Sequence, residues 1–242
     1  MDGASAVLEL LNGPRLVIRG RPVAVPDGGM RPLVYLALQP GPVPRARAAG
    51  TLWPEGHEAR ARGNLRSALW RLRGAGIAVV TSDQGRLALR DDVLVDLDAV
   101  NAWAGQMIAG RVGPAELTVP DHAFEALNLL TGWYDDWIIM QRERVRQRLL
   151  YALEILSARL AAGGRHFEAV EVALSAVHAD PLRETAQQAL VAAHLANGNR
   201  AEARRVQRAY AELLRTELGL EPGDLVQGRG LVRRPITAPT RW

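Results

Sequence analysis

An arginine-rich segment, ARARGNLRSALWRLR from Ala59 to Arg73, carries the side chains with the clearest chemical potential in the chain. Guanidinium groups can bind guanine edges or phosphates, and an asparagine amide can bind adenine. The apolar positions of the segment recur at the spacing of a helix that packs on a core by one face. They are Ala61, Leu65, Ala68, Leu69 and Leu72. The segment therefore predicts a helix that buries one face and can recognise DNA with the others.

The polar side chains of this segment fall into two rows on opposite flanks of the predicted helix. The candidates for contacts with or near the DNA bases form the first row, and they are Arg60, Asn64, Ser67 and Arg71. We expect the second row and two upstream arginines to contact phosphates, and these residues are Arg62, Arg66, Arg73, Arg45 and Arg47. A solvated charged face is the alternative interpretation of such a helix. The segment alone leaves both interpretations open, and it does not decide which row faces the bases.

The elements around this segment favour DNA recognition over a solvated face. Pro32 and the apolar residues after it predict a first helix over 30–38, a weaker helix follows over 45–52, and glycines end the arginine-rich third helix. Two short strands joined by Ser82–Gly85 predict a hairpin after that helix. Three helices closed by a hairpin form a winged helix-turn-helix, whose third helix enters the major groove. The strands that we expect in this part are 7–11, 16–19, 22–25, 77–81 and 86–89.

Beyond Asp96 the sequence changes to long amphipathic helices. A glycine, a glutamate and an alanine recur after 198 − 164 = 34 positions, which is the period of tetratricopeptide (TPR) repeats. The first set is Gly164, Glu168 and Ala169, and the second is Gly198, Glu202 and Ala203. The pair Asp180-Pro181 predicts the start of a helix, because Asp is a good N-cap and Pro a good first helical residue. The apolar stripes that we expect to face the core are Leu149, Leu153, Leu156 and Leu160; Phe167, Val170, Leu174 and Val177; and Ala203, Val206, Tyr210 and Leu213.

The composition excludes several kinds of chemistry. All 30 basic residues are arginine and the chain has no cysteine. Lysine nucleophiles, phosphate-binding lysines, disulfides and thiolate metal sites are therefore excluded. The five histidines lack metal-ligand spacing. The carboxylate pair Asp135-Asp136 lies among aromatic residues in a segment that we expect to connect helices, and it indicates a structural anchor rather than a catalytic pair. We expect no enzyme activity, no cofactor and no metal site.

Charge and hydropathy indicate the compartment and the partner. Residues 1–90 hold 13 arginines and 6 acidic residues, or 13 − 6 = +7, whereas the whole chain carries +4. The basic character is thus concentrated around the predicted winged helix, as expected for a nucleic-acid partner. No apolar run reaches the roughly 18 residues of a membrane helix, and the N-terminus lacks a signal-peptide pattern. We expect a cytoplasmic protein without a membrane segment.

An ordered set of motifs resembles the Streptomyces antibiotic regulatory proteins (SARPs). The first half carries LWPE, ARGNLRSALWRLR and VDLDAV, and it is similar to their OmpR-type winged helix. The second half carries WYDDWIIMQRERVRQ, DPLRETAQQAL, GNRAEA and ELGLEPG, and it is similar to their bacterial transcriptional activation domain. The resemblance extends from about Val7 to Gly223 and keeps the order of the family.

The resemblance implies a mainly α fold with a small N-terminal β component, in which a winged helix-turn-helix domain precedes an all-α, TPR-like helical-repeat domain. It implies a sequence-specific transcriptional activator that binds direct repeats in promoter DNA as a dimer. Such an activator recruits RNA polymerase through the sigma factor and other subunits of the polymerase. The implied target is a biosynthetic gene cluster. The alternative is a helical-repeat adaptor whose winged helix does not read DNA. The expected domains are 1–95 for DNA binding, 96–223 for activation and 224–242 as a flexible basic tail.

Overall fold

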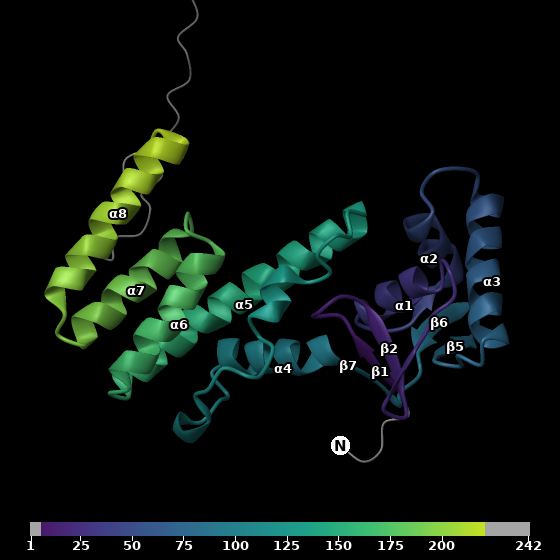
Figure 1. Cartoon of the computed structure of the whole chain (residues 1–242), viewed down its shortest axis with the longest axis horizontal. Coiled ribbons are helices and arrows are strands. Elements are labelled where there is room, and N and C mark those ends of the chain that lie inside the picture. Colours follow the sequence, from purple (N-terminus) through teal and green to yellow (C-terminus); the bar gives the residue numbers. More distant parts are fainter. Residues whose placement is uncertain (1–5, 221–242) are drawn as a thin grey trace, which may run out of the picture. The chain divides into compact units, whose positions relative to one another are not determined.

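The computed structural model describes residues 6–220, and its elements form two compact units. The first unit contains the chain up to Val112 together with Thr118–Ala152. The second contains Gly113–Leu117 and the chain from Leu153 onward. The fold is mainly helical with a small β component near the N-terminus (Figure 1), which confirms the predicted fold class. The predicted basic tail, 224–242, lies outside the described residues.

A four-stranded sheet begins the first unit, with the strand order β3-β2-β1-β7. β1 pairs with β2 in antiparallel register, so that Leu8 faces Leu16, and both of these leucines are fully buried. β7 is a strand that the sequence did not predict, and it adds parallel to β1 with Ala6 opposite Val93. The strands of this sheet are β1 (Ala6–Glu9), β2 (Arg15–Ile18), β3 (Arg21–Val23) and β7 (Val93–Val95).

Three helices follow β3 and form the core of the winged helix. The arginine-rich helix α3 buries the five apolar side chains predicted from its sequence, and each is at most 7% exposed. Gly29, just before α1, lets the chain approach α3 closely, since a Cβ at this position would lie 2.9 Å from Cδ2 of Leu72. The helices are α1 (Met30–Ala37), α2 (Arg45–Leu52) and α3 (Glu58–Gly74), close to the predicted ranges.

The wing is a three-stranded sheet with the order β4-β6-β5. Its two-residue turn has Gln84 at φ 44° and Gly85 at φ 74°, the left-handed conformations of a type I′ hairpin turn. The predicted hairpin is therefore present, but its loop is shorter than predicted, because Ser82 and Asp83 continue the strand and pair with β6. The strands are β4 (Val43–Pro44), β5 (Val80–Asp83) and β6 (Arg86–Leu89).

Two helices beyond the wing belong wholly or partly to the first unit: α4 (Asp96–Ile108) and α5 (Asp136–Ala162). The Asp96 carboxylate accepts hydrogen bonds from the backbone N–H groups of Leu10 and Leu11, and this ties the start of α4 to the end of β1. The first compact unit therefore extends past residue 95. The functional boundary between residues 95 and 96 stays a prediction.

Aromatic packing fixes the start of α5 against α1. The rings of Trp137 and Tyr35 meet edge to face, with their centroids 5.3 Å apart and an interplanar angle of 86°. The Arg31 guanidinium also donates to the Asp135 carboxylate. These contacts agree with an aromatic anchor rather than a catalytic pair. One detail was wrong, because Asp136 does not lie in a connecting segment but begins the 27-residue helix α5.

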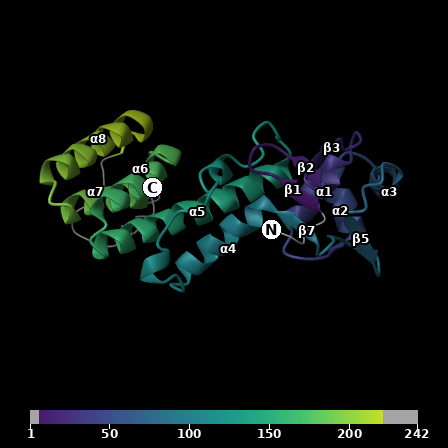
Figure 2. The same cartoon turned by 60° about the horizontal axis from the view of Figure 1, so that its bottom comes forward.

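The second unit contains the end of α5 and three further helices that pack in sequence, α6 on α7 and α7 on α8 (Figures 1 and 2). The repeat predicted from the sequence is present. Gly164 and Gly198 adopt φ 78° and 74° in the turns before α6 and α8, and the repeated alanines Ala169 and Ala203 are buried. The helices are α6 (His166–Ala179), α7 (Glu184–Ala196) and α8 (Arg200–Leu218), and the short 3-10 turns elsewhere are η1 (Pro114–Glu116) and η2 (Glu125–Asn128).

Two sequence predictions for the second unit were wrong. Phe167 is 74% exposed, and the buried face of α6 consists of Ala169, Val172, Ala173 and Ala176 instead of the predicted larger side chains. Small side chains face the neighbouring helices because they let the backbones approach closely. Pro181 does not open a helix either, since α7 begins at Glu184. Polar contacts hold this turn: Arg183 and Thr185 both donate to the buried carboxylate of Glu154 on α5.

Candidate nucleic-acid interface

The outer surface of α3 carries the candidate DNA-binding side chains. Because its apolar face is buried, the two polar rows lie on opposite flanks of the exposed surface. Between them, at the outermost position, lie Gly63 and Trp70, and the Trp70 side chain is 72% exposed. The helix therefore presents charge on both flanks and an indole between them.

A shallow hollow of about 350 Å³ lies beside the second polar row. It gathers parts of three elements, namely the first turn of α2, the middle of α3 and the turn of the wing. Three guanidinium-bearing residues lie around it, and all three belong to the set predicted to contact phosphates. Its lining consists of Arg45, Ala46, Arg62, Leu65, Arg66 and Gly85.

Hydrogen bonds attach the wing to the start of α2 at this hollow. The backbone N–H of Arg45 donates to the carbonyl of Gly85 over 2.9 Å, and its guanidinium donates to Oγ of Ser82 over 3.1 Å. The position of the wing turn relative to α2 and α3 is thus fixed by contacts rather than left to a free loop. Sequence reasoning missed Ser82 and Gly85 as positioning residues, although the Gln-Gly pair is a turn signal.

Positive side chains outnumber negative ones at the hollow. Arg66 is exposed and makes no ion pair among the described residues. Arg62 pairs with Glu58 one turn earlier on α3, and both side chains are more than half exposed. Such surface pairs contribute little stability, so an incoming phosphate can displace the carboxylate at small cost. The hollow can therefore accept one or more phosphate groups.

The first polar row lies on the other flank, next to the loop before α1. The Arg71 guanidinium donates to the carbonyl of Asp27 over 2.7 Å, so this arginine is bound within the fold although it is exposed. Arg60 and Ser67 are also exposed, and Asn64 is half-buried. None of these four residues lines the hollow beside α2 and the wing.

The remaining candidate arginines occupy separate positions. Arg73 lines a small hollow of about 60 Å³ between the end of α3 and β5, and Arg47 is exposed on α2. Two further arginines of the wing region make internal contacts: Arg86 donates to the carbonyl of Pro42, and Arg90 forms an ion pair with Asp92. Of the predicted phosphate contacts, Arg45, Arg62 and Arg66 line the hollow beside the wing, and Arg47 and Arg73 do not line it.

Two other kinds of feature, a metal site and a membrane span, are absent from residues 6–220. No group of three or more histidine, aspartate or glutamate side chains lies close enough to hold a metal ion there. Nor is any helix of this part of the chain long and apolar enough to cross a membrane.

The comparisons with known proteins agree with this architecture. The model of a family described as the bacterial transcriptional activator domain matches residues 82–229, more than half of the chain. Among solved structures, Mycobacterium tuberculosis EmbR in complex with a low-affinity phosphopeptide is similar, with a TM-score of 0.66 and 20% identity. The match covers 92% of this chain and 63% of the EmbR chain. At this identity the likeness shows the fold alone. No curated protein gives a significant sequence match.

Proposed function

This chain belongs to the bacterial transcriptional activator domain family, and on that premise we propose that it is a sequence-specific, DNA-binding transcriptional activator of the SARP type. The family match confirms the resemblance inferred from the ordered motifs. In this proposal the protein acts in the cytoplasm, binds direct repeats in promoter DNA as a dimer and recruits RNA polymerase, including its sigma factor. Genes for a biosynthetic pathway are the proposed target.

The observation that carries the proposal is the arginine-lined hollow where α2, α3 and the wing meet. In winged helices the third helix enters the major groove, while flanking elements contact the backbone on either side. Arg45, Arg62 and Arg66 lie around one hollow beside α3. Guanidinium groups at such a position bind phosphates and set the register of the helix on the duplex.

The proposed contacts divide along the two flanks of α3. The flank with Arg62 and Arg66 lies against one DNA strand, and we assign phosphates to the set Arg45, Arg47, Arg62, Arg66 and Arg73. The other flank reads bases through Arg60, Asn64 and Ser67. Arg71 can join them only after its bond to the Asp27 carbonyl is exchanged for a base contact. Its net contribution is therefore smaller than that of an arginine without an internal partner.

The helical repeats supply the proposed activating surface. Helix pairs of this kind bind proteins rather than catalyse reactions. The match of the family model to residues 82–229 supports this role, because it contains α6, α7 and α8. The proposal therefore assigns DNA recognition to the winged helix and contact with polymerase, or with a second copy, to the helical part.

Fluorescence anisotropy with labelled duplexes tests DNA reading. The full chain is titrated with upstream DNA of its own and neighbouring genes and with a scrambled duplex of equal length. Asn64→Ala should weaken binding to the target by about 1–3 kcal/mol and leave binding to the scrambled duplex unchanged. Arg66→Gln should weaken binding to both duplexes. Arg111→Gln, an exposed change in the same unit, is the matched control.

Two outcomes contradict the proposal. Equal loss on both duplexes for Asn64→Ala removes its base-reading role, since a base contact must discriminate between sequences. Equal affinity of the unmodified chain for target and scrambled DNA, with strong salt sensitivity, favours the adaptor in which the winged helix does not read DNA.

A further inference from the structure

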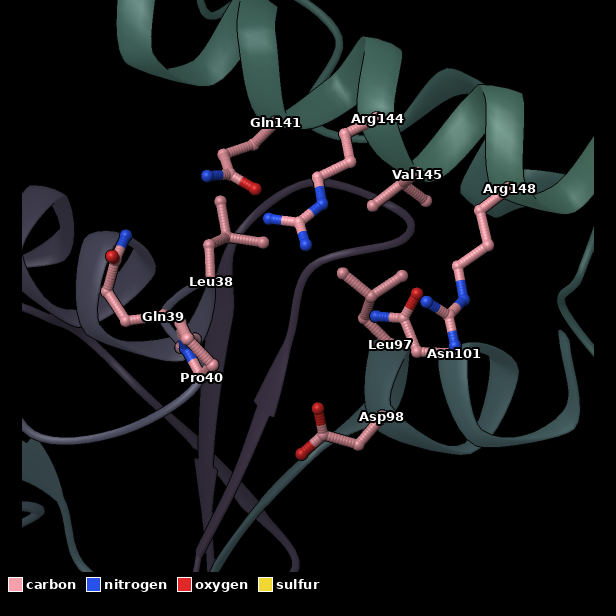
Figure 3. Close-up of a pocket in the computed structure, with 11 residues that line it drawn as sticks. Leu38, Gln39, Pro40, Leu97, Asp98, Asn101, Gln141, Arg144, Val145 and Arg148 are labelled. Carbon is pink, nitrogen blue, oxygen red and sulfur yellow. The ribbon is translucent and has the colours of Figure 1, made fainter. Parts of the chain in front are cut away.

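A second polar hollow, of about 240 Å³, lies within the first compact unit among the turn after α1, the first half of α4 and the first half of α5 (Figure 3). It is separate from the candidate DNA surface, because none of its lining residues belongs to α2, α3 or the wing. Leu97 and Val145 are its buried apolar members. Its polar members are Gln39, Asp98, Asn101, Gln141, Arg144 and Arg148.

Two arginines of this hollow have no partner in the described part of the chain. Arg144 and Arg148 extend from α5 into the hollow, and neither makes a hydrogen bond or an ion pair with residues 6–220. They lie one helical turn apart, so their side chains are neighbours on one face of α5. Like charges at this spacing destabilise a helix by a few tenths of a kcal/mol. A bound anion would remove this repulsion.

A glycine in α4 makes room for one of these guanidinium groups. A Cβ at Gly105 would lie 2.5 Å from Nη2 of Arg148, a distance that real Cβ atoms do not reach. Gly105 lies inside α4, where glycine costs about 1 kcal/mol relative to alanine. The end of a flexible arginine side chain can shift at small cost, so the glycine allows this position of the Arg148 guanidinium and an alanine would displace it.

The acidic member of the hollow does not neutralise the arginines. The pKa of Asp98 is raised, first by burial and second by the charge of Asp96. An ion pair with Arg144 or Arg148 would act in the opposite direction. The amides of Gln39, Asn101 and Gln141 add donors that an anionic ligand can use.

We propose that this hollow binds a small anion of the carboxylate or phosphate class, with Arg144 and Arg148 as its anchors and the neighbouring amides as further donors. Arginine suits this task because its planar guanidinium binds either group with two parallel hydrogen bonds. The volume suits a small molecule, since an engineered cavity of about 150 Å³ is enough for benzene. The bound anion connects the end of α1, within the winged helix, to α4 and α5.

Isothermal titration calorimetry of the full chain in a chloride buffer tests the site, with inorganic phosphate and succinate as separate probes. At least one probe should bind saturably with one site per chain. Arg144→Gln and Arg148→Gln should each weaken that binding about tenfold or more, because each removes a charge-assisted hydrogen bond. Asp98→Asn should tighten it, because a nearby negative charge is removed. Arg111→Gln should leave it unchanged.

Gly105→Ala separates binding from stability. The alanine should raise or preserve the melting temperature through its helix propensity, yet weaken binding by displacing the Arg148 guanidinium. The probe that binds more tightly identifies whether the site prefers phosphate or carboxylate ligands. Absence of saturable binding for both probes overturns the proposal. A second result also overturns the proposal: binding persists in Arg144→Gln and in Arg148→Gln but is lost in an Arg62→Gln, Arg66→Gln double variant. The anion then binds at the candidate DNA surface.

Discussion

Replacing the three arginines of the DNA-facing hollow should change how DNA binding depends on salt. The triple variant Arg45→Gln, Arg62→Gln, Arg66→Gln removes the three guanidinium groups that lie around one hollow. Each phosphate neutralised by a protein contributes about 0.9 to the slope of log K against log salt concentration. If each arginine takes one phosphate, the slope should become shallower by about 2.7. Between about 50 and 200 mM salt, the variant should then lose about 1.6 decades less affinity than the unmodified chain.

The control for this prediction removes the same charge elsewhere. The control is a second triple variant in the other compact unit, Arg200→Gln, Arg204→Gln, Arg208→Gln. These three arginines are exposed on α8, and their replacement changes the net charge by the same amount. Anisotropy titrations of all three proteins at several salt concentrations give the slopes. A slope that changes equally in both triple variants, or in neither, would refute a phosphate role for this hollow. A change confined to the first variant supports the role.

Three further predictions concern the stability of the fold. Trp137→Ala should lower the free energy of unfolding by about 1–3 kcal/mol in denaturant titrations, because it removes a half-buried indole and its edge-to-face contact with Tyr35. The change Trp70→Ala, at an exposed indole, should leave it nearly unchanged. Gly29→Ala should lower the free energy of unfolding by about 1–3 kcal/mol in the same titrations, since the new Cβ would lie 2.9 Å from a methyl group of α3. An unchanged unfolding midpoint would contradict this, because it would show that the loop moves away from α3 without loss of stability. Tyr210→Phe should flatten the loss of stability at high pH. Burial raises the pKa of Tyr210, so its contribution is present below the ordinary value of about 10 and is lost as the pH rises through the raised value; equal slopes for both proteins above pH 10 would contradict this assignment.

Local sequence signals predicted the winged helix well. The predicted core face of α3 is the observed one, because the period of its apolar residues depends only on helix geometry. The parallel addition of β7 to β1 was missed, since it joins residues far apart in the sequence and has no local signature. The same holds for β4, whose two residues are defined only by their pairing with β6.

In the helical part, residue size misled the prediction. Large apolar residues at helical spacing indicated a core face for α6, yet Phe167 is exposed and alanines face the neighbouring helices. Glycine and alanine at a fixed period were the better guide, because close helix packing requires small residues at fixed positions. Gly164 and Gly198, which the repeat identified, adopt the left-handed turns that this packing needs.

For the candidate site, the sequence identified the arginines but not their grouping. The two rows of α3 follow from helical spacing, whereas the flank that lies beside the wing depends on tertiary contacts. The bond between the backbone N–H of Arg45 and the carbonyl of Gly85 is one such contact. The bond from Arg71 to the Asp27 carbonyl is another, and no sequence pattern indicated it.

A DNase footprint of the full chain on upstream DNA of its own and neighbouring genes tests the central claim most directly. Reading of direct repeats by α3 predicts two protected segments whose centres are separated by a whole number of helical turns, each about 10–10.5 base pairs. Asn64→Ala should abolish the protection at a protein concentration that still coats random DNA. Uniform protection along every fragment, unchanged in the variant, would contradict sequence-specific recognition by this helix.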